Sequence, residues 1–244
     1  MPRIDRGGTM VAMLPIARRS LLTVAALCGI GAARRSAAAQ SDADFANLAR
    51  YADDNRRLIA AGHHGGIVFL GDSITEGWGA LRPAVFGANR INRGISGQTS
   101  AQMLVRMMPD VVALRPQALH LMAGTNDVGA FGPDAPDRLA ANLTAICQIA
   151  HANGIAVLLA SVPPTDALPW QPGLETVGPI RRINRWIAAE APRLAARMID
   201  YTPVLATPAG AMRPGMAGDG VHPTADGFAA METVLLPVLR ELGL

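Results

Sequence analysis

Two periodicities of apolar residues alternate along the chain after residue 40. Continuous apolar runs of strand length, such as "GIVFLGD" and "IAVLLASV", are separated by segments with apolar residues at three- and four-residue steps. The runs are typical of buried strands and the stepped segments of amphipathic helices. Because the strands lack a polar face and alternate with helices, the pattern predicts a parallel sheet covered by helices on both faces.

The predicted elements follow one another in a regular order. A first helix is expected within residues 44–62, with Phe45, Leu48, Leu58 and Ile59 at helical spacing. The strands are expected within residues 66–72, 89–96, 117–124, 155–162 and 196–201. The later helices are expected at residues 99–114, with a kink or break at Pro109, and at 136–154, 178–191 and 224–242.

The first 39 residues have the pattern of an export signal. Arg18 and Arg19 precede an apolar run over residues 21–33, and Ala37–Ala39 offers a cleavage site before Gln40. The run is shorter than the roughly 20 residues that a spanning helix needs. We therefore predict export to the periplasm or the exterior, no stable membrane anchor after cleavage, and one domain over residues 40–244. The arginine pair is similar to that of twin-arginine signals, and the export route stays open.

The charge and the cysteine content of residues 40–244 argue against nucleic-acid binding and against an internal disulfide. Residues 40–244 carry 16 Arg, no Lys and 18 acidic residues, a formal charge of −2. Nucleic-acid binding needs a basic patch that offsets phosphate charge, and these arginines do not cluster strongly, so we predict no nucleic-acid partner. Cys147 is the one cysteine after residue 40, which excludes an internal disulfide, and its apolar surroundings predict a packed thiol. The oligomeric state stays open.

Four short blocks are expected at the carboxyl ends of strands, where open parallel sheets bind their ligands. They are "GDS" (71–73), "GISGQTS" (94–100), "GTND" (124–127) and "DGVHP" (219–223). A hydroxyl is a poor nucleophile at neutral pH, so it needs a base within about 3 Å and a group that orients that base. Ser73, His222 and Asp219 would supply these three parts. Taken alone, Ser73 and His222 could equally be helix caps.

The two middle blocks offer donors for a developing oxyanion. Acyl transfer places negative charge on the carbonyl oxygen, and donors aimed at that position are worth roughly 3 to 4 kcal/mol each. Gly97 can bring a bare backbone N–H close to substrate, Asn126 can offer a side-chain amide, and the N–H of Ser73 would be the third donor. Gly94 is a second candidate for the glycine position.

Together, "FLGDSITEGW", "NRGISGQTS", "AGTNDV" and "DGVHPTADG" resemble the SGNH, or GDSL-type, hydrolase family. The resemblance implies a flavodoxin-like three-layer α/β/α sandwich with a five-stranded parallel sheet. It also implies Ser73 as nucleophile, Asp219 and His222 as the other triad members, and Ser73, Gly97 and Asn126 as oxyanion donors. The α/β-hydrolase alternative needs G-x-S-x-G around the serine, which this chain lacks.

This chemistry requires no organic cofactor and no metal. His63 and His64 are adjacent but have no third ligand at usable spacing, which favours a turn over a metal site. Asp72 and Asp127 flank the site positions, and hydrogen bonds that cap helices or fix loops are the expected role for both.

The predicted function is an exported serine esterase. The second block, "NRGISGQTS", is similar to that of family members that act on short acyl groups, and this resemblance implies substrates such as O-acetyl groups on carbohydrates. A lysophospholipase or thioesterase for longer acyl chains is the alternative within enzymes, and a non-catalytic sugar- or lipid-binding module is the alternative of another class. Trp78 and Trp170 are candidates to line the substrate pocket, although either could pack against the Pro-rich loop instead.

Overall fold

Five strands pair in parallel in the order β2–β1–β3–β4–β5, which is the flavodoxin-like strand order. The computed structural model describes residues 44–87 and 89–244, so the predicted export signal lies outside the described residues. The strands are β1 (Ile67–Gly71), β2 (Arg90–Gly94), β3 (Ala118–Met122), β4 (Ala156–Ala160) and β5 (Arg197–Ile199). Each lies within a segment in which the sequence predicted a strand.

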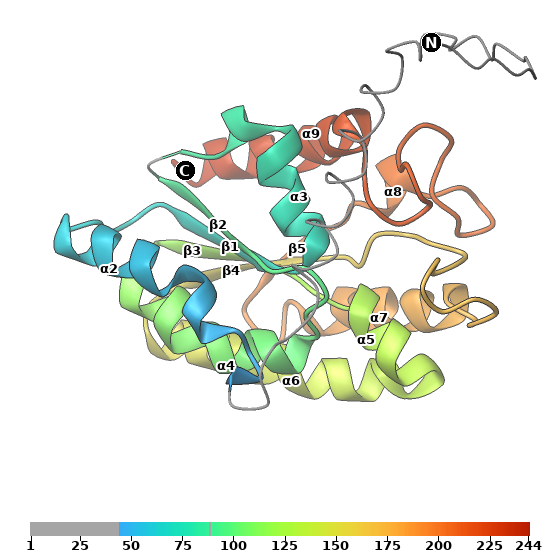
Figure 1. Cartoon of the computed structure of the whole chain (residues 1–244), viewed down its shortest axis with the longest axis horizontal. Helices are drawn as coiled ribbons and strands as arrows, with labels where there is room; N and C mark the ends of the chain where they lie inside the picture. The colour runs from blue at the N-terminus through green and yellow to red at the C-terminus, as the bar shows by residue number, and fades with distance from the viewer. Residues whose placement is uncertain (1–43, 88) are drawn as a thin grey trace, which may run out of the picture. The chain divides into compact units, whose positions relative to one another are not determined.

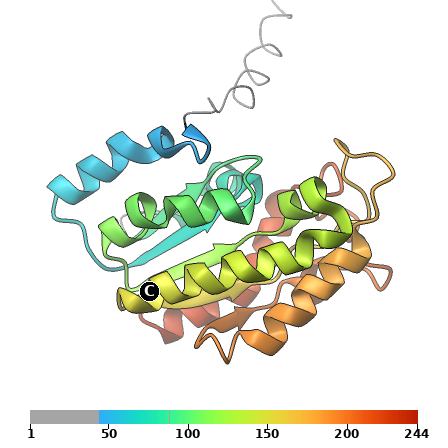
Figure 2. The same ribbon diagram turned by 90° about the horizontal axis from the view of Figure 1, so that it is seen from below.

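Helices cover both faces of this sheet, and the α/β fold class is confirmed (Figures 1 and 2). One face carries α3 (Ser73–Leu81), α8 (Thr202–Leu205) and α9 (Ala225–Glu241), and the other carries α4 (Ser100–Asp110), α6 (Ala135–Ala152) and α7 (Val177–Glu190). Val68 and Leu70 of β1 belong to the core under α4, whereas Ile67 and Phe69 belong to the core under α3. A strand buried on both faces therefore reads as a continuous apolar run.

The order of the strands reverses at β1, because β2 follows β1 in the chain but β3 pairs with the other edge of β1. Ser73 begins α3 directly after β1, and Asn126 lies in α5 (Thr125–Phe131), which begins two residues after β3. Open parallel sheets bind ligands outside the carboxyl ends of their strands at such a reversal. The two predicted site residues therefore lie at the expected edge of the sheet.

The first helix departs from the prediction. The chain forms a 3-10 turn, η2 (Leu48–Tyr51), and then α2 (Ala52–Ala60), with Phe45 55% and Ile59 48% exposed. The buried residue of α2 is Asn55, whose amide donates to Asp110 Oδ1 at 2.6 Å. Of the four predicted apolar residues, Leu58 packs against the core and the other three are exposed, because α2 also docks through polar contacts with the end of α4.

The start of α4 is capped, and the predicted break at Pro109 is confirmed. Thr99 and Gln102 form a capping box at its N-terminus. Pro109 lies in its last turn, and a separate 3-10 turn, η4 (Val112–Leu114), follows. The short turns η3 (Pro83–Val85) and η5 (Gly132–Asp134) complete the described secondary structure.

The helices differ in how far they bury their sulfur-containing side chains, and their length and apolar character show whether they could span a membrane. Cys147 is fully buried in α6, as expected, and burial raises the pKa of its thiol to about 11. Met103 and Met107 of α4 are buried as well, whereas Met108 is 57% exposed. Within residues 44–87 and 89–244, no helix combines the length and the apolar character that a membrane span requires.

Candidate active site

The "GDS" block forms a tight turn from β1 into α3. A Cβ on Gly71 would lie 2.0 Å from Thr75 Oγ1, so only glycine lets the first turn of α3 pack this closely on the strand end. Asp72 caps the helix, because its Oδ1 accepts the N–H of Ile74 at 2.9 Å. The N–H of Ser73 makes no hydrogen bond with the described part of the chain. The turn thus presents a hydroxyl and a free backbone donor at one point.

Ser73, His222 and Asp219 form one hydrogen-bonded chain. Ser73 Oγ lies 2.9 Å from His222 Nε2, and His222 Nδ1 lies 2.7 Å from Asp219 Oδ2. The other oxygen of Asp219 accepts the backbone N–H groups of His222 at 2.7 Å and Val221 at 3.0 Å. One carboxylate therefore folds the loop and orients the imidazole. This arrangement lets the imidazole take a proton from the hydroxyl.

Asp219 and His222 lie on the surface side of the site, with side chains 43% and 40% exposed. Burial acts to raise the pKa of Asp219, but the hydrogen bonds from His222 and Val221 outweigh it and hold the pKa below its usual range. The carboxyl group is therefore ionised at neutral pH. A charged carboxylate stabilises an imidazolium formed beside it.

Gly97 is the open glycine of the second block. Its φ is +79°, and a Cβ at this position would meet no atom within 4 Å. Its N–H has no hydrogen-bond partner within residues 44–87 and 89–244. By contrast, a Cβ on Gly94 would lie 2.2 Å from the backbone nitrogen of Glu76, so Gly94 is required for packing between α3 and β2. The geometry favours Gly97 over Gly94 as a donor to a bound ligand.

Asn126 points its amide into the space between these two loops. Its Nδ2 lies 3.1 Å from the carbonyl oxygen of Gln98 and 3.3 Å from Asp72 Oδ2. Asp72 is 2% exposed, and burial raises its pKa to about 6, against the N–H of Ile74 and the charge of His222, which lower it. The buried carboxyl group therefore links the cap of α3 to the amide of Asn126.

Asp127 and Glu76 fix the conformation of the loop that contains Gly97, and neither belongs to the hydrogen-bonded chain of Ser73, His222 and Asp219. Asp127 is fully buried and accepts the N–H and the hydroxyl of Ser100 at 3.0 and 2.5 Å, a loop-fixing role that the sequence predicted. Glu76 accepts the N–H and the hydroxyl of Ser96 at 2.9 and 2.5 Å and pairs with Arg50 at 3.1 Å. The sequence analysis missed Glu76, although its place one helical turn after Ser73 was a usable signal.

The two tryptophans proposed for the substrate pocket have different surroundings. Trp78 was expected at the pocket, but it is fully buried, stacks on Phe228 and donates its indole N–H to Glu232 at 3.2 Å. Trp78 belongs to the core because its side chain faces α9 rather than the site. Trp170 is 45% exposed, and its ring centroid lies 6.0 Å from that of His222.

The positions of the possible metal ligands bear on metal binding. In the described part of the chain, no three His, Cys, Asp or Glu side chains lie close enough to hold a metal ion together.

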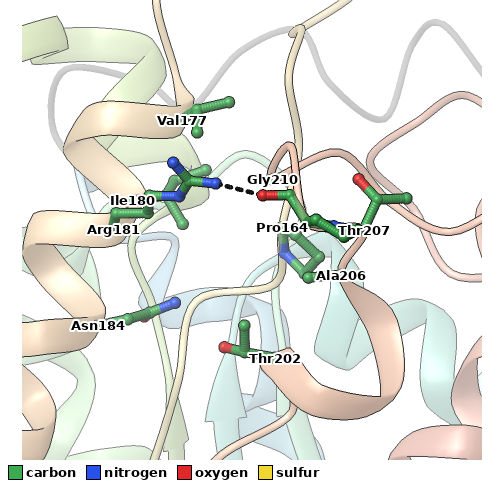
Figure 3. Close-up of a pocket in the computed structure, with 10 residues that line it drawn as sticks. Pro164, Val177, Ile180, Arg181, Asn184, Thr202, Ala206, Thr207 and Gly210 are labelled. Carbon is green, nitrogen blue, oxygen red and sulfur yellow. Dashed lines mark hydrogen bonds between the residues drawn. The ribbon is translucent and has the colours of Figure 1, made fainter.

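A separate pocket of about 190 Å³ lies between the loop after β4, α7 and the segment around α8 (Figure 3). Pro164, Val177 and Ile180 line its apolar side, and Arg181 at its edge donates to the carbonyl of Pro208 at 2.8 Å. None of the predicted site residues lines this pocket.

A flavodoxin-like parallel sheet with a hydrogen-bonded serine, histidine and aspartate at its carboxyl edge is an arrangement that hydrolases use. The chain belongs to the GDSL-like lipase/acylhydrolase family, whose family model matches residues 69–230. This span contains all four blocks.

Two individual proteins illustrate the similarity. The crystal structure of a GDSL-like lipase from Bacteroides thetaiotaomicron superposes with a TM-score of 0.75 and 36% identity, over 81% of this chain and 99% of that one. Esterase TesA of Pseudomonas aeruginosa is 29% identical over 178 residues, which cover 71% of this chain and 83% of that protein. The family predicted from the four blocks is therefore confirmed.

Proposed function

We propose that the protein is a serine esterase that hydrolyses carboxylic esters through an acyl-enzyme. The observation that carries this proposal is the continuous chain from Ser73 Oγ through His222 to Asp219, with contacts of 2.9 and 2.7 Å. Membership in a hydrolase family supports the reaction class. The roles of the individual residues follow from their geometry.

Acylation begins with attack of Ser73 Oγ on the ester carbonyl carbon while His222 Nε2 takes the hydroxyl proton. The carbonyl oxygen becomes an oxyanion, which the N–H groups of Ser73 and Gly97 stabilise. The Asn126 amide adds a third hydrogen bond when the hydrogen of its longer, 3.3 Å contact with Asp72 turns to the oxyanion. His222 then gives its proton to the leaving alkoxide oxygen, and the carbon–oxygen bond to the alcohol breaks. The products of this half-reaction are the free alcohol and an ester of Ser73.

Deacylation repeats the sequence with water. His222 removes a proton from a water molecule, the resulting hydroxide attacks the acyl carbon, and Ser73 Oγ leaves with the proton that His222 returns. Asp219 orients the imidazole and stabilises its charged form in both halves, but it does not itself accept the proton.

The substrate we propose is an ester of a short acyl group with a carbohydrate. Trp170 supports this proposal, because its half-exposed indole stands beside the imidazole that protonates the leaving group. A residue beside that imidazole faces the alcohol part of the ester. A flat indole surface suits the apolar face of a sugar ring. The N-terminal pattern with Arg18 and Arg19 further leads us to propose that the enzyme works outside the cytoplasm.

The first experiment measures hydrolysis of p-nitrophenyl acetate, butyrate, octanoate and palmitate by the wild type and by Ser73→Ala. We expect a short-chain optimum and a loss of roughly 10⁴-fold or more in Ser73→Ala, with unchanged thermal unfolding. Substantial activity in folded Ser73→Ala would refute the mechanism. A long-chain optimum would favour lysophospholipids or thioesters, and no turnover of any ester would favour a binding module.

A second experiment distinguishes recognition of the alcohol part of the ester from recognition of the acyl part. Trp170→Ala is compared with Gln171→Ala, an exposed neighbour in the same loop, on ethyl acetate, phenyl acetate and an acetylated xyloside. We expect Trp170→Ala to lower kcat/KM about tenfold on the acetylated sugar and little on ethyl acetate, because only the larger alcohol reaches the indole. Equal losses on all three esters would mean that Trp170 only supports His222.

A further inference from the structure

A charged side chain is completely buried beneath the candidate site. Arg106 of α4 has no exposed surface, and each nitrogen of its guanidinium has a partner. Nε donates to Gln98 Oε1 at 2.7 Å and Nη1 to Asp110 Oδ2 at 2.7 Å. Nη2 donates to the carbonyls of Arg93 at 3.0 Å and Gly71 at 3.4 Å. Burying a guanidinium is costly, and packed apolar residues often stabilise a fold as well or better, so stability alone does not account for it.

Three of these partners lie at the edge of the sheet where the site is built. The carbonyl of Gly71 ends β1, two residues before Ser73, and the carbonyl of Arg93 lies near the end of β2. Gln98 directly follows Gly97. One guanidinium therefore joins the strand that carries the nucleophile to the loop that carries the proposed backbone donor.

Gln98 is held at every polar atom of its side chain and at its carbonyl. It is fully buried, with Oε1 accepting from Arg106 and Nε2 donating to the carbonyl of Ala46 at 2.7 Å. Its own carbonyl accepts the amide of Asn126 at 3.1 Å. A side chain fixed at both ends leaves its peptide little freedom to rotate. The Asn126 amide contacts the carbonyl of Gln98, and Gly97 is bonded to the backbone nitrogen of Gln98, so both donors are anchored to this one residue.

We propose that Gln98, held by Arg106, is a positioning residue that orients the Gly97 N–H and the Asn126 amide toward the oxyanion. This inference rests on the proposed acyl transfer. Donors stabilise a developing charge best when they need no rearrangement at the moment of reaction. Gln98 touches no reacting atom, so it acts through these two donors. The N-terminal segment contributes to the same support through the carbonyl of Ala46.

The test uses Gln98→Met, which keeps the length of the side chain and removes both hydrogen bonds. Gln98→Glu keeps an oxygen for Arg106, and Ile146→Val is a remote core control in α6. Arg106→Lys is the second variant, because an ammonium cannot serve Gln98, Asp110 and two carbonyls in the same fork geometry. Near-ultraviolet circular dichroism and urea midpoints establish that each variant is folded before it is assayed.

The main readout is the rate of covalent labelling by an alkyl fluorophosphonate. In this reaction Ser73 Oγ bonds to phosphorus, His222 takes the hydroxyl proton and fluoride leaves, while the phosphoryl oxygen occupies the place of the oxyanion. We expect labelling by Gln98→Met and Arg106→Lys to slow by roughly tenfold to a hundredfold. The kcat for the best ester should fall by the same factor with KM within about twofold. Ile146→Val should stay within about threefold of the wild type. Gln98→Glu keeps the bond to Arg106 but places an acceptor against the carbonyl of Ala46, so we expect its loss to lie between those of Ile146→Val and Gln98→Met.

Several results would overturn the inference. Unchanged labelling in folded Gln98→Met would do so, as would an equal loss in Ile146→Val, which would indicate a general effect of stability. If the wild type reacts with the fluorophosphonate but hydrolyses no ester, the proposed function fails while the labelling comparison still decides this inference. A wild type that is not labelled at all overturns both.

Discussion

The two halves of the candidate site are built in different ways. Ser73 lies at the junction of β1 and α3, above Asp72, which is 2% exposed, and Arg106, which is fully buried. His222 and Asp219 lie on an irregular loop before α9, with side chains 40% and 43% exposed. The nucleophile half is therefore part of the core, whereas the base half is held mainly by hydrogen bonds within its own loop.

This difference matches what each half has to do. The hydroxyl and the oxyanion donors must keep fixed positions relative to one another, and a buried network of paired groups provides this. The imidazole must exchange protons with an alcohol and with water, so it needs an accessible position. We therefore expect substitutions of the buried side chains beneath Ser73 to lower both stability and activity, and substitutions of the His222 and Asp219 side chains to lower activity alone.

The largest effect is expected in the base half. His222→Ala should lower kcat/KM by roughly 10⁴-fold or more, because the general base is lost, and should change the free energy of unfolding by less than about 1 kcal/mol. Asp219→Asn should cost less, on the order of 10²- to 10⁴-fold, because its oxygen can still accept the N–H groups of the loop. Ester kinetics and urea unfolding measure both. A large loss of stability in His222→Ala would erase the contrast between the halves.

Arg106→Met tests the nucleophile half. Removing the guanidinium leaves Asp110 as a buried charge without its partner, and we expect a loss of about 3 to 5 kcal/mol in the free energy of unfolding. Arg181→Ala, at an exposed arginine of α7, is the matched control and should change stability by no more than about 0.5 kcal/mol. Urea unfolding monitored by circular dichroism compares the two. Similar small losses of unfolding free energy in both variants would show that the buried network does not stabilise the fold.

Asp72 gives the nucleophile half a pH dependence. Burial raises its pKa in the folded protein to about 6, above the ordinary value of 3.8, so the folded state binds the proton more tightly than the unfolded state. The stability from this group is present below pH 4 and is lost as the pH rises through 6. Relative to Asp72→Asn, the wild type should lose on the order of 3 kcal/mol between about pH 4 and pH 7. Urea unfolding across this range checks the sign, and a constant difference would refute it.

The smallest effect compares two open glycines, one in each half. Gly97 and Gly220 have φ values of +79° and +83°, and a Cβ at either would meet no atom within 4 Å. An alanine in this backbone region costs roughly 1 kcal/mol. We expect Gly97→Ala to lower kcat several-fold more than Gly220→Ala, because Glu76 and Gln98 hold the Gly97 loop while the other loop can relax. Equal losses in kcat would show that both loops are equally rigid.

Much of this organisation could be predicted from the sequence. The apolar runs located β1, β3 and β4, since a strand buried on both faces leaves few polar positions within it. The alternation of strands with helices located the more polar β2 and the short β5. The four blocks identified the family because the tight turn at Gly71, the cap at Asp72 and the open Gly97 each permit few residue types. The spacing of Asp219 and His222 within one loop allowed their contact to be expected without a structure.

Other features depended on contacts between distant segments. Leu, Phe and Ile at helical spacing predicted an apolar face for the first helix, but the polar end of α4 pairs with Asn55 instead. Trp78 and Trp170 were equivalent in the sequence, and only packing against Phe228 placed one in the core while the other remained beside His222. The sequence by itself determined the strands, the family and the residues able to do the chemistry, because these follow from local periodicity and from residue type. The tertiary structure alone decided which groups are buried around Arg106. Its pairing with Asp110 is an i,i+4 contact within α4, but its contacts with Gln98 and with the carbonyls of Gly71 and Arg93 form only when α4 packs against two strand ends, and no local pattern records them.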